Sequence, residues 1–121
     1  MANTPKIFES EYRFCMIVWE TEPANSGELV KLANARLGWS KATTYTVIRR
    51  LCERGVLKNE NAVVTALVTK DQVQTAEIEE MVDKTFAGSV PAFIAAFSRS
   101  KKLSTKQIEE IMQILDGAEE K

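Results

Sequence analysis

The sequence predicts a mainly α-helical chain that carries one small β-hairpin. Two helical segments joined by a tight glycine-containing turn, two short β-prone runs directly after them, and three further helical segments lead to this fold class. The chain has 121 residues, of which 45% are hydrophobic and 27% are charged. This is the composition of an ordinary globular protein, and the length allows one compact domain, or a small domain with a dimerisation extension.

The first two predicted helices are delimited by capping residues. Ser10 is the expected N-cap of a helix that runs to about Glu20. Asn25 and Glu28 fit a capping box for the second helix, because each side chain can accept a backbone donor at that helix end. Gly38 suits the left-handed position after the second helix.

A third helix, within the stretch from Trp39 to Arg54, begins at Ser40 as its N-cap and ends at Gly55. Its inward face is predicted to consist of Thr44, Val47, Ile48 and Leu51. So short a connection between two helices is typical of a helix-turn-helix.

Two β-prone runs, 56–58 and 63–68, follow this helix, and residues 59–62 form the predicted turn between them. Three helices followed directly by a hairpin is the element order of a winged helix. The sequence therefore predicts a winged-helix domain over residues 1–69.

Residues 70–121 are predicted to form a helical dimerisation domain. A long helix ends before Gly88, a short apolar helix opens at Ser89 and Pro91, and a last helix begins with the capping box of Ser104 and Gln107. About fifty residues make a small independent fold, so a second copy is expected to complete the apolar core. The residues expected in that contact are Met81, Val82, Phe86, Phe93, Ile94, Phe97, Ile108, Ile111, Met112 and Leu115.

The net charge of −1 conceals an asymmetry between the two halves of the chain. Residues 1–70 carry ten Lys or Arg against seven Asp or Glu, whereas residues 71–121 carry six against ten. A basic first half suits a protein that binds a polyanion at one end. The expected DNA contacts on and beside the third helix are Ser40, Lys41, Thr43, Tyr45, Thr46, Arg49, Arg50, Arg54 and Lys58.

Several other classes of protein are disfavoured. The chain has no histidine, and Cys15 and Cys52 are not in a CxxC pair, so neither a metal site nor a cofactor is expected. Both thiols are interpreted as buried small hydrophobes, with a redox switch as the alternative. The sequence also has no glycine-rich phosphate-binding loop, so an enzyme is not expected. The absence of an export signal or a bilayer-length apolar run predicts a cytoplasmic protein without membrane insertion.

The chain resembles the penicillinase repressors, a family that includes the β-lactamase and methicillin-resistance repressors. The resemblance is carried by residues 10–19 and 38–51, by Ala87-Gly88-Ser89, and by the helix start at Lys102-Leu103-Ser104. It implies homodimers that bind palindromic operators with TACA/TGTA half-sites and control a β-lactam or cell-wall stress response gene. In the match, DNA-facing positions are occupied by Ser40, Lys41, Thr43, Thr46 and Arg50. Tyr45 stands where staphylococcal members commonly have Arg.

The resemblance also implies a way to release DNA. Antibiotic-responsive members are cleaved between Asn and Phe in the dimerisation domain, after activation of a membrane sensor protease or its downstream protease. The corresponding bond here is Ala96–Phe97, so Ala replaces the Asn. Copper-responsive relatives carry a cysteine-rich tail, which this sequence lacks after Cys52.

These observations predict a homodimeric repressor that places its third helix in the major groove of double-stranded operator DNA. The alternative is a winged-helix adaptor that binds proteins and never contacts DNA. The acidic pI of 5.6 and the single cation of the predicted wing, Lys58, favour that alternative.

Overall fold

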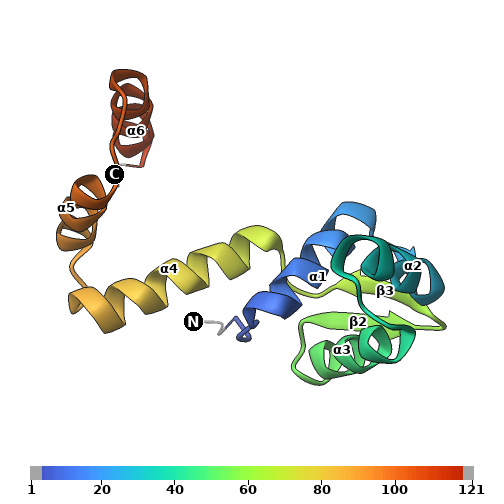
Figure 1. Cartoon of the computed structure of the whole chain (residues 1–121). Coiled ribbons are helices and arrows are strands. Elements are labelled where there is room, and N and C mark those ends of the chain that lie inside the picture. The colour runs from blue at the N-terminus through green and yellow to red at the C-terminus, as the bar shows by residue number, and fades with distance from the viewer. Residues whose placement is uncertain (1–3, 119–121) are drawn as a thin grey trace. The chain divides into compact units, whose positions relative to one another are not determined.

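A computed structural model describes residues 4–118, and within this range the chain forms six helices and three short strands (Figure 1). The chain divides into two compact units, one up to Ile78 and the other from Glu79. The elements are α1 (Glu9–Thr21), β1 (Ala24–Asn25), α2 (Ser26–Leu37), α3 (Lys41–Glu53), β2 (Leu57–Glu60), β3 (Val63–Ala66), α4 (Lys70–Phe86), α5 (Val90–Ser100) and α6 (Thr105–Gly117).

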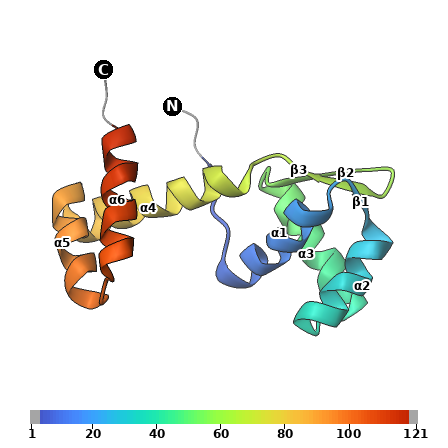
Figure 2. The same cartoon turned by 90° about the horizontal axis from the view of Figure 1, so that it is seen from above.

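The N-terminal unit is a winged helix. The strands form an antiparallel sheet in the order β1-β3-β2, and this sheet lies on one side of the three helices (Figure 2). Apolar faces of the helices and the sheet bury one continuous core, which confirms the predicted fold class. The buried core residues are Ile7, Phe14, Cys15, Ile17, Val18, Ala24, Leu29, Ala33, Val47, Ile48, Leu51, Val56, Leu57, Val64 and Val73.

Asn25, Gly38 and Ser40 cap the helix-turn-helix as the sequence predicts, but the capping box predicted for α2 is incomplete: within residues 4–118 only its Asn25 half forms. The Asn25 side chain accepts a hydrogen bond from the backbone N–H of Gly27 at 2.8 Å, and α2 ends at Gly38 with a φ of 73°. Ser40 Oγ accepts from the backbone N–H of Thr43 at 3.1 Å. Because both helix ends at the turn are capped, the connection between α2 and α3 is short.

The predicted cap of the first helix is wrong. The helix begins at Glu9, so Ser10 lies inside its first turn. The backbone N–H of Phe8 instead donates to Glu11 Oε1 at 3.0 Å. The Glu11 carboxylate thus satisfies the N–H of the N-cap residue, which is the glutamate half of a capping box, and it also complements the positive end of the helix dipole.

The hairpin turn is tighter than the predicted turn over residues 59–62. Asn59 and Glu60 belong to β2, and Glu60 pairs with Val63 across the hairpin. Only Asn61 and Ala62 form the loop, with φ values of 53° and 65°. Two consecutive positive φ angles define a type I′ turn, whose twist matches that of the strands it joins.

We expect Ala62→Gly to stabilise the N-terminal unit. Ala62 has a left-handed backbone conformation that is unfavourable for a residue with a Cβ, and glycine removes this steric cost. The greater conformational entropy of glycine in the unfolded chain offsets part of this gain. The expected net increase in the free energy of unfolding is therefore about 0.5–1 kcal/mol. Chemical denaturation measures it, and an equal or lower stability of the variant would contradict the strain at Ala62.

Strand β1 was not predicted from the sequence. Ala24 pairs with Val64, and Asn25 pairs with Val63, so this two-residue strand adds an edge to the hairpin. The backbone N–H of Ser26 also donates to the carbonyl of Ala62 at 2.8 Å. These bonds join the start of α2 to the hairpin tip, and a segment so short has no detectable period of its own.

Helices α4, α5 and α6 occupy the rest of the described chain. Helix α4 belongs to both units, because Val73 in its first turns is part of the N-terminal core. The predicted caps of the last two helices are confirmed: Ser89 Oγ accepts from the Ala92 N–H, and Ser104 and Gln107 form a reciprocal capping box. No helix within residues 4–118 is long and apolar enough to span a bilayer.

Candidate nucleic-acid interface

Helix α3 is fixed to the core by one face. As predicted, Thr44, Val47, Ile48 and Leu51 are buried. The buried hydroxyl of Thr44 donates to the carbonyl of Ser40 at 3.0 Å, so its polar atom is satisfied inside the core. The buried face therefore determines which side chains α3 presents outward.

The outward face of α3 carries polar and basic groups. Lys41, Thr43, Arg49 and Arg50 are exposed, and the exposed fraction of Tyr45 is 39%. Thr46 is half-buried, and Ser40 is exposed at the N-cap. The sequence has no carboxylate from Ser40 to Cys52, so three cations on this face are not offset by acidic groups on the same stretch. Such a face suits an anionic partner with hydrogen-bonding edges.

Arg54 has a partner within the fold. Its Nη2 atom contacts Glu11 Oε1, the oxygen that also accepts the Phe8 N–H. The guanidinium carbon lies 5.4 Å from the centroid of the Phe8 ring. Glu11 is only 8% exposed, and its charge is compensated by Arg54. Arg54 thus joins the C-terminal end of α3 to the start of α1, and its expected contact with DNA stays a prediction.

Lys58 also has an acidic partner. Its Nζ atom lies 3.2 Å from Glu60 Oε1, and both side chains are largely exposed. Side chains alternate along a strand, so Lys58 and Glu60 share one face of β2, while buried Leu57 and exposed Asn59 share the other. The predicted contact of Lys58 with DNA stays a prediction, and the local charge of the hairpin is offset by Glu60.

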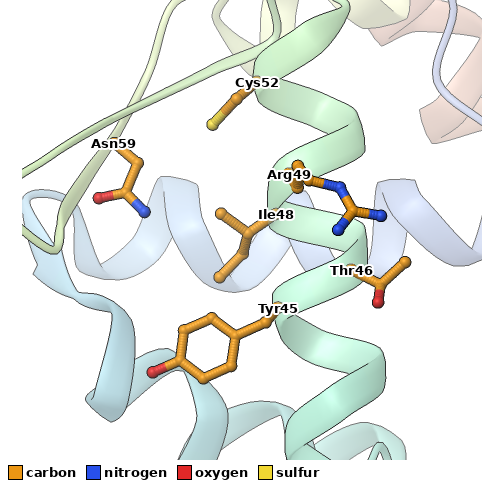
Figure 3. A pocket seen from close by; sticks show the side chains of 6 residues that line it. All are labelled: Tyr45, Thr46, Ile48, Arg49, Cys52 and Asn59. Atoms are coloured by element: carbon orange, nitrogen blue, oxygen red, sulfur yellow. The ribbon is translucent and has the colours of Figure 1, made fainter.

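An open hollow lies between α3 and the hairpin (Figure 3). The side chains of Tyr45, Ile48 and Cys52 extend from α3 toward the strand that carries Asn59. The hollow has a volume of about 470 Å³ and is lined by Tyr45, Thr46, Ile48, Arg49, Cys52 and Asn59. Asn59 was predicted to lie in a turn, and a contact with α3 was therefore not expected. Its strand register is what brings it to this position.

The two tryptophans pack against the core of the N-terminal unit. Trp19 Nε1 donates to the carbonyl of Val68 at 3.0 Å, and its ring meets Tyr12 edge-on at 5.6 Å. Trp39, in the turn before α3, stacks on Phe14 with ring centroids 5.5 Å apart. Trp19 therefore packs against the core with its indole N–H satisfied, and Trp39 packs beneath the turn that precedes α3.

The two cysteines have different environments. Cys15 is fully buried, and desolvation, followed by the nearby charge of Glu11, raises the pKa of its thiol to about 12. Cys52 is half-buried at the hollow, and burial, followed by the charge of Glu53, raises its thiol pKa. Both thiols are therefore largely protonated at neutral pH. The prediction of a buried thiol is confirmed for Cys15 and wrong for Cys52, which is only partly covered because it lies at the edge of the open hollow.

The C-terminal unit contains a small aromatic cluster. The rings of Phe86 and Phe93 meet at 5.7 Å, and those of Phe93 and Phe97 lie 6.2 Å apart. Of the ten residues expected in a dimer contact, Val82 is buried, while Met81, Phe86, Phe93 and Ile111 are half-buried. The other five are exposed, and they are Ile94, Phe97, Ile108, Met112 and Leu115.

The bond between Ala96 and Phe97 lies inside α5, with more than one helical turn before it. Phe97 is 37% exposed, and the backbone N–H of Lys101 donates to its carbonyl. Access of a protease to this bond requires α5 to open locally, because proteases act on the transiently opened chain.

Comparison with known proteins identifies the family of this fold and interface. The family model for penicillinase repressors matches residues 7–117. The chain belongs to the penicillinase repressor family. This confirms the resemblance drawn from residues 10–19 and 38–51. The match covers both units of this family member rather than the winged helix alone.

Curated relatives in the penicillinase repressor family match along nearly the whole chain. The methicillin resistance regulatory protein MecI of Staphylococcus aureus is 25% identical over 118 residues, which cover 94% of this chain and 96% of MecI. The penicillinase repressor of Bacillus licheniformis is 24% identical, with coverage of 96% and 94%. Among solved structures, the monomeric form of BlaI from Bacillus licheniformis in complex with the blaP half-operator is similar, with a TM-score of 0.51 and 25% identity. That match covers 59% of this chain and 92% of the BlaI chain.

Proposed function

We propose that this protein is a homodimeric transcriptional repressor that inserts α3 into the major groove of each half of a palindromic operator. Half-sites of the TACA/TGTA type, about one helical turn apart, and control of a β-lactam or cell-wall stress response gene are parts of this proposal. The observation that carries it is the outward face of α3, which is basic and hydroxyl-rich. The similar BlaI structure, which contains a half-operator, supports the same assignment.

The outward side chains fall into two groups by their place on α3. Thr43, Tyr45, Thr46 and Arg49 are proposed to approach base edges, since arginine can donate two hydrogen bonds to guanine and the threonine methyl can contact thymine. Ser40, Lys41 and Arg50 are proposed to lie near phosphates. The N-terminus of α3 adds backbone donors and a favourable helix dipole to that second group.

Selection of bound duplexes from a random pool tests this function directly. The full chain should enrich inverted repeats that contain TACA/TGTA-type half-sites, and fluorescence anisotropy should then show tight binding that weakens as salt rises. Failure to retain any duplex at low salt would exclude DNA binding. Enrichment of unrelated sites would retain the repressor and replace the proposed half-site.

A second copy of the C-terminal unit is the proposed cover for its exposed apolar side chains. Helix α6 presents Ile108, Met112 and Leu115 with exposed fractions of 45%, 60% and 54%. Their spacing of four and three residues places them on one helical face. Ile114, which the sequence analysis did not include, is 67% exposed. A surface of this kind is stabilised when a twofold-related copy buries it.

We expect the double variant Met112→Glu/Leu115→Glu to be monomeric in sedimentation at micromolar concentration, with the 13.6 kDa mass of one chain. Burying two carboxylates in an apolar contact is costly, so the dimer should dissociate. The control Lys106→Gln/Gln113→Glu changes the net charge by the same two units on the other face of α6 and should remain dimeric. A dimeric Met112→Glu/Leu115→Glu variant would rule out α6 as the contact.

The adaptor hypothesis has one structural observation in its favour. Arg54 and Lys58 both contact glutamates, so fewer cations are available to DNA than the sequence suggests. Retention of the chain on a column of generic duplex at low salt, followed by release with salt, separates the two functions. An adaptor would pass through that column.

Release from DNA by proteolysis is proposed at the Ala96–Phe97 bond, with a membrane sensor protease or its downstream protease as the partner. Mass spectrometry of the chain recovered from antibiotic-treated cells tests this step. Fragments ending at Ala96 are expected, and an intact chain under derepressing conditions would contradict it.

A further inference from the structure

The hollow between α3 and β2 adjoins the proposed major-groove face and shares Tyr45, Thr46 and Arg49 with it. We propose that it holds one deoxyribose-phosphate unit of the operator strand that passes between the major groove and the hairpin. This inference rests on the proposed function, and it names the part of the DNA that meets Ile48, Cys52 and Asn59, which are not among the predicted DNA contacts.

The lining of the hollow is matched to a sugar-phosphate rather than to a base edge alone. Ile48, Cys52 and the ring of Tyr45 supply apolar contact of the kind that suits a deoxyribose. Asn59 carries amide donors, and the exposed Arg49 adds positive charge at the same site. Phosphate oxygens accept hydrogen bonds from asparagine, arginine and tyrosine side chains in protein–DNA complexes.

The strand register gives Asn59 its place. Asn59 pairs with Val64, which is fully buried, and it shares the inner face of β2 with buried Leu57. The neighbouring Lys58 and Glu60 lie on the opposite face and pair with each other. The hairpin therefore offers α3 a neutral amide donor, while its own cation lies on the other side.

The path of a DNA strand explains why the hollow should be occupied. When a helix lies in the major groove, the phosphodiester strand at the groove edge separates it from the adjacent minor groove. A hairpin beside that helix meets this strand. In the present fold, the hollow lies in the space between α3 and the hairpin (Figure 3). In the proposed complex, the DNA strand that borders the major groove therefore passes over the hollow.

Cys52 offers a chemical probe of this site. Cys52 Sγ lines the hollow, so a bound sugar-phosphate would shield it from reagents in solution. The other cysteine, Cys15, is fully buried and does not compete for the reagent in the folded chain. Alkylation of Cys52 therefore reports occupancy of this site.

The first experiment measures the rate of Cys52 alkylation by iodoacetamide in the full chain, with and without a saturating duplex that contains two inverted TACA/TGTA half-sites. Mass spectrometry locates the adduct, and anisotropy on the same sample shows that the duplex is bound. Shielding should slow the reaction at least tenfold. An unchanged rate with the duplex bound overturns the proposal but leaves the repressor function intact. Absence of duplex binding is instead a failure of the proposed function.

A matched variant controls for general shielding by DNA. Cys52→Ser/Ser10→Cys moves the reactive thiol from the hollow to the exposed first turn of α1 with two isosteric changes. Its alkylation rate should change little when the same duplex binds. An equal slowing in both proteins would mean that DNA shields the whole unit, and the assignment of the hollow would fall.

A second pair of variants tests the role of Asn59. Asn59→Asp and Gln72→Glu each lower the net charge of the N-terminal unit by one, because each replaces an exposed amide with a carboxylate of the same size. Gln72 Oε1 accepts from the backbone N–H of Thr69 at the start of α4, a bond that a carboxylate keeps. Asn59→Asp should weaken duplex binding at least tenfold, because a carboxylate would face the phosphate, whereas Gln72→Glu should weaken it no more than threefold. Equal losses in the two variants would indicate general electrostatics and contradict a site at Asn59. Thermal unfolding of both variants verifies that the fold is retained.

Discussion

Replacing both arginines on the outward face of α3, in the variant Arg49→Ala/Arg50→Ala, is expected to weaken operator binding by roughly 30- to 1,000-fold. An arginine at a base edge contributes about 1–3 kcal/mol and one at a phosphate about 1 kcal/mol, so the two together give about 2–4 kcal/mol in the binding free energy. The slope of log affinity against log salt should also fall by about one for each lost phosphate contact. Fluorescence anisotropy over a series of salt concentrations measures both quantities.

The control for this prediction is Arg13→Ala/Arg36→Ala. It removes the same charge from α1 and α2, where Arg13 pairs with Glu9 at 3.0 Å and Arg36 pairs with Glu20 at 2.9 Å. Exposed pairs of this kind contribute little to stability, so the fold should be retained. If both double variants lose affinity to the same extent, the effect is that of net charge, and the face of α3 has no special role.

Leu51→Ala should lower the free energy of unfolding of the N-terminal unit by about 2–5 kcal/mol. Leu51 is fully buried on the inward face of α3, and alanine would leave a cavity that the surrounding core fills only in part. A loss of this size is a large fraction of the stability of a small domain, so DNA binding should decline as well. Urea denaturation followed by tryptophan fluorescence gives the value.

The same substitution at Leu67 provides the comparison. Leu67 lies just after β3 and its exposed fraction is 54%. Surface substitutions usually change the free energy of unfolding by less than about 0.5 kcal/mol, so Leu67→Ala should remain close to the parent protein. Similar losses at Leu51 and Leu67 would be incompatible with the core described for α3.

Local patterns in the sequence were sufficient to predict the winged helix. Gly38 and Ser40 determine where α2 ends and α3 begins, because each residue type has a specific capping geometry. The helical spacing of Thr44, Val47, Ile48 and Leu51 predicted the buried face of α3, and the outward face followed from it. These features depend on residues close in sequence, which is why they could be inferred.

Features that depend on contacts between distant segments could not be predicted. Arg54 was grouped with the other cations because its partner, Glu11, is 43 positions away along the chain. Asn59 was assigned to a turn because the composition of residues 59–62 does not reveal that Asn61 and Ala62 alone make the loop. With the shorter loop, Asn59 belongs to β2, and the alternation of side chains along the strand places it on the same face as Leu57. The same limit applies to β1, whose two residues form a strand only because β3 lies beside them.

The positions of the two tryptophans allow unfolding of the N-terminal unit to be followed separately by fluorescence. Trp19 and Trp39 both lie in the unit that ends at Ile78, and the sequence has no tryptophan after them. Intrinsic emission therefore monitors unfolding of the winged helix alone, whereas far-ultraviolet circular dichroism records helices throughout the chain. Superposition of the two melting curves would mean that both units unfold as one cooperative system. Curves with separate midpoints would reveal a state in which one unit has lost its structure while the other retains it.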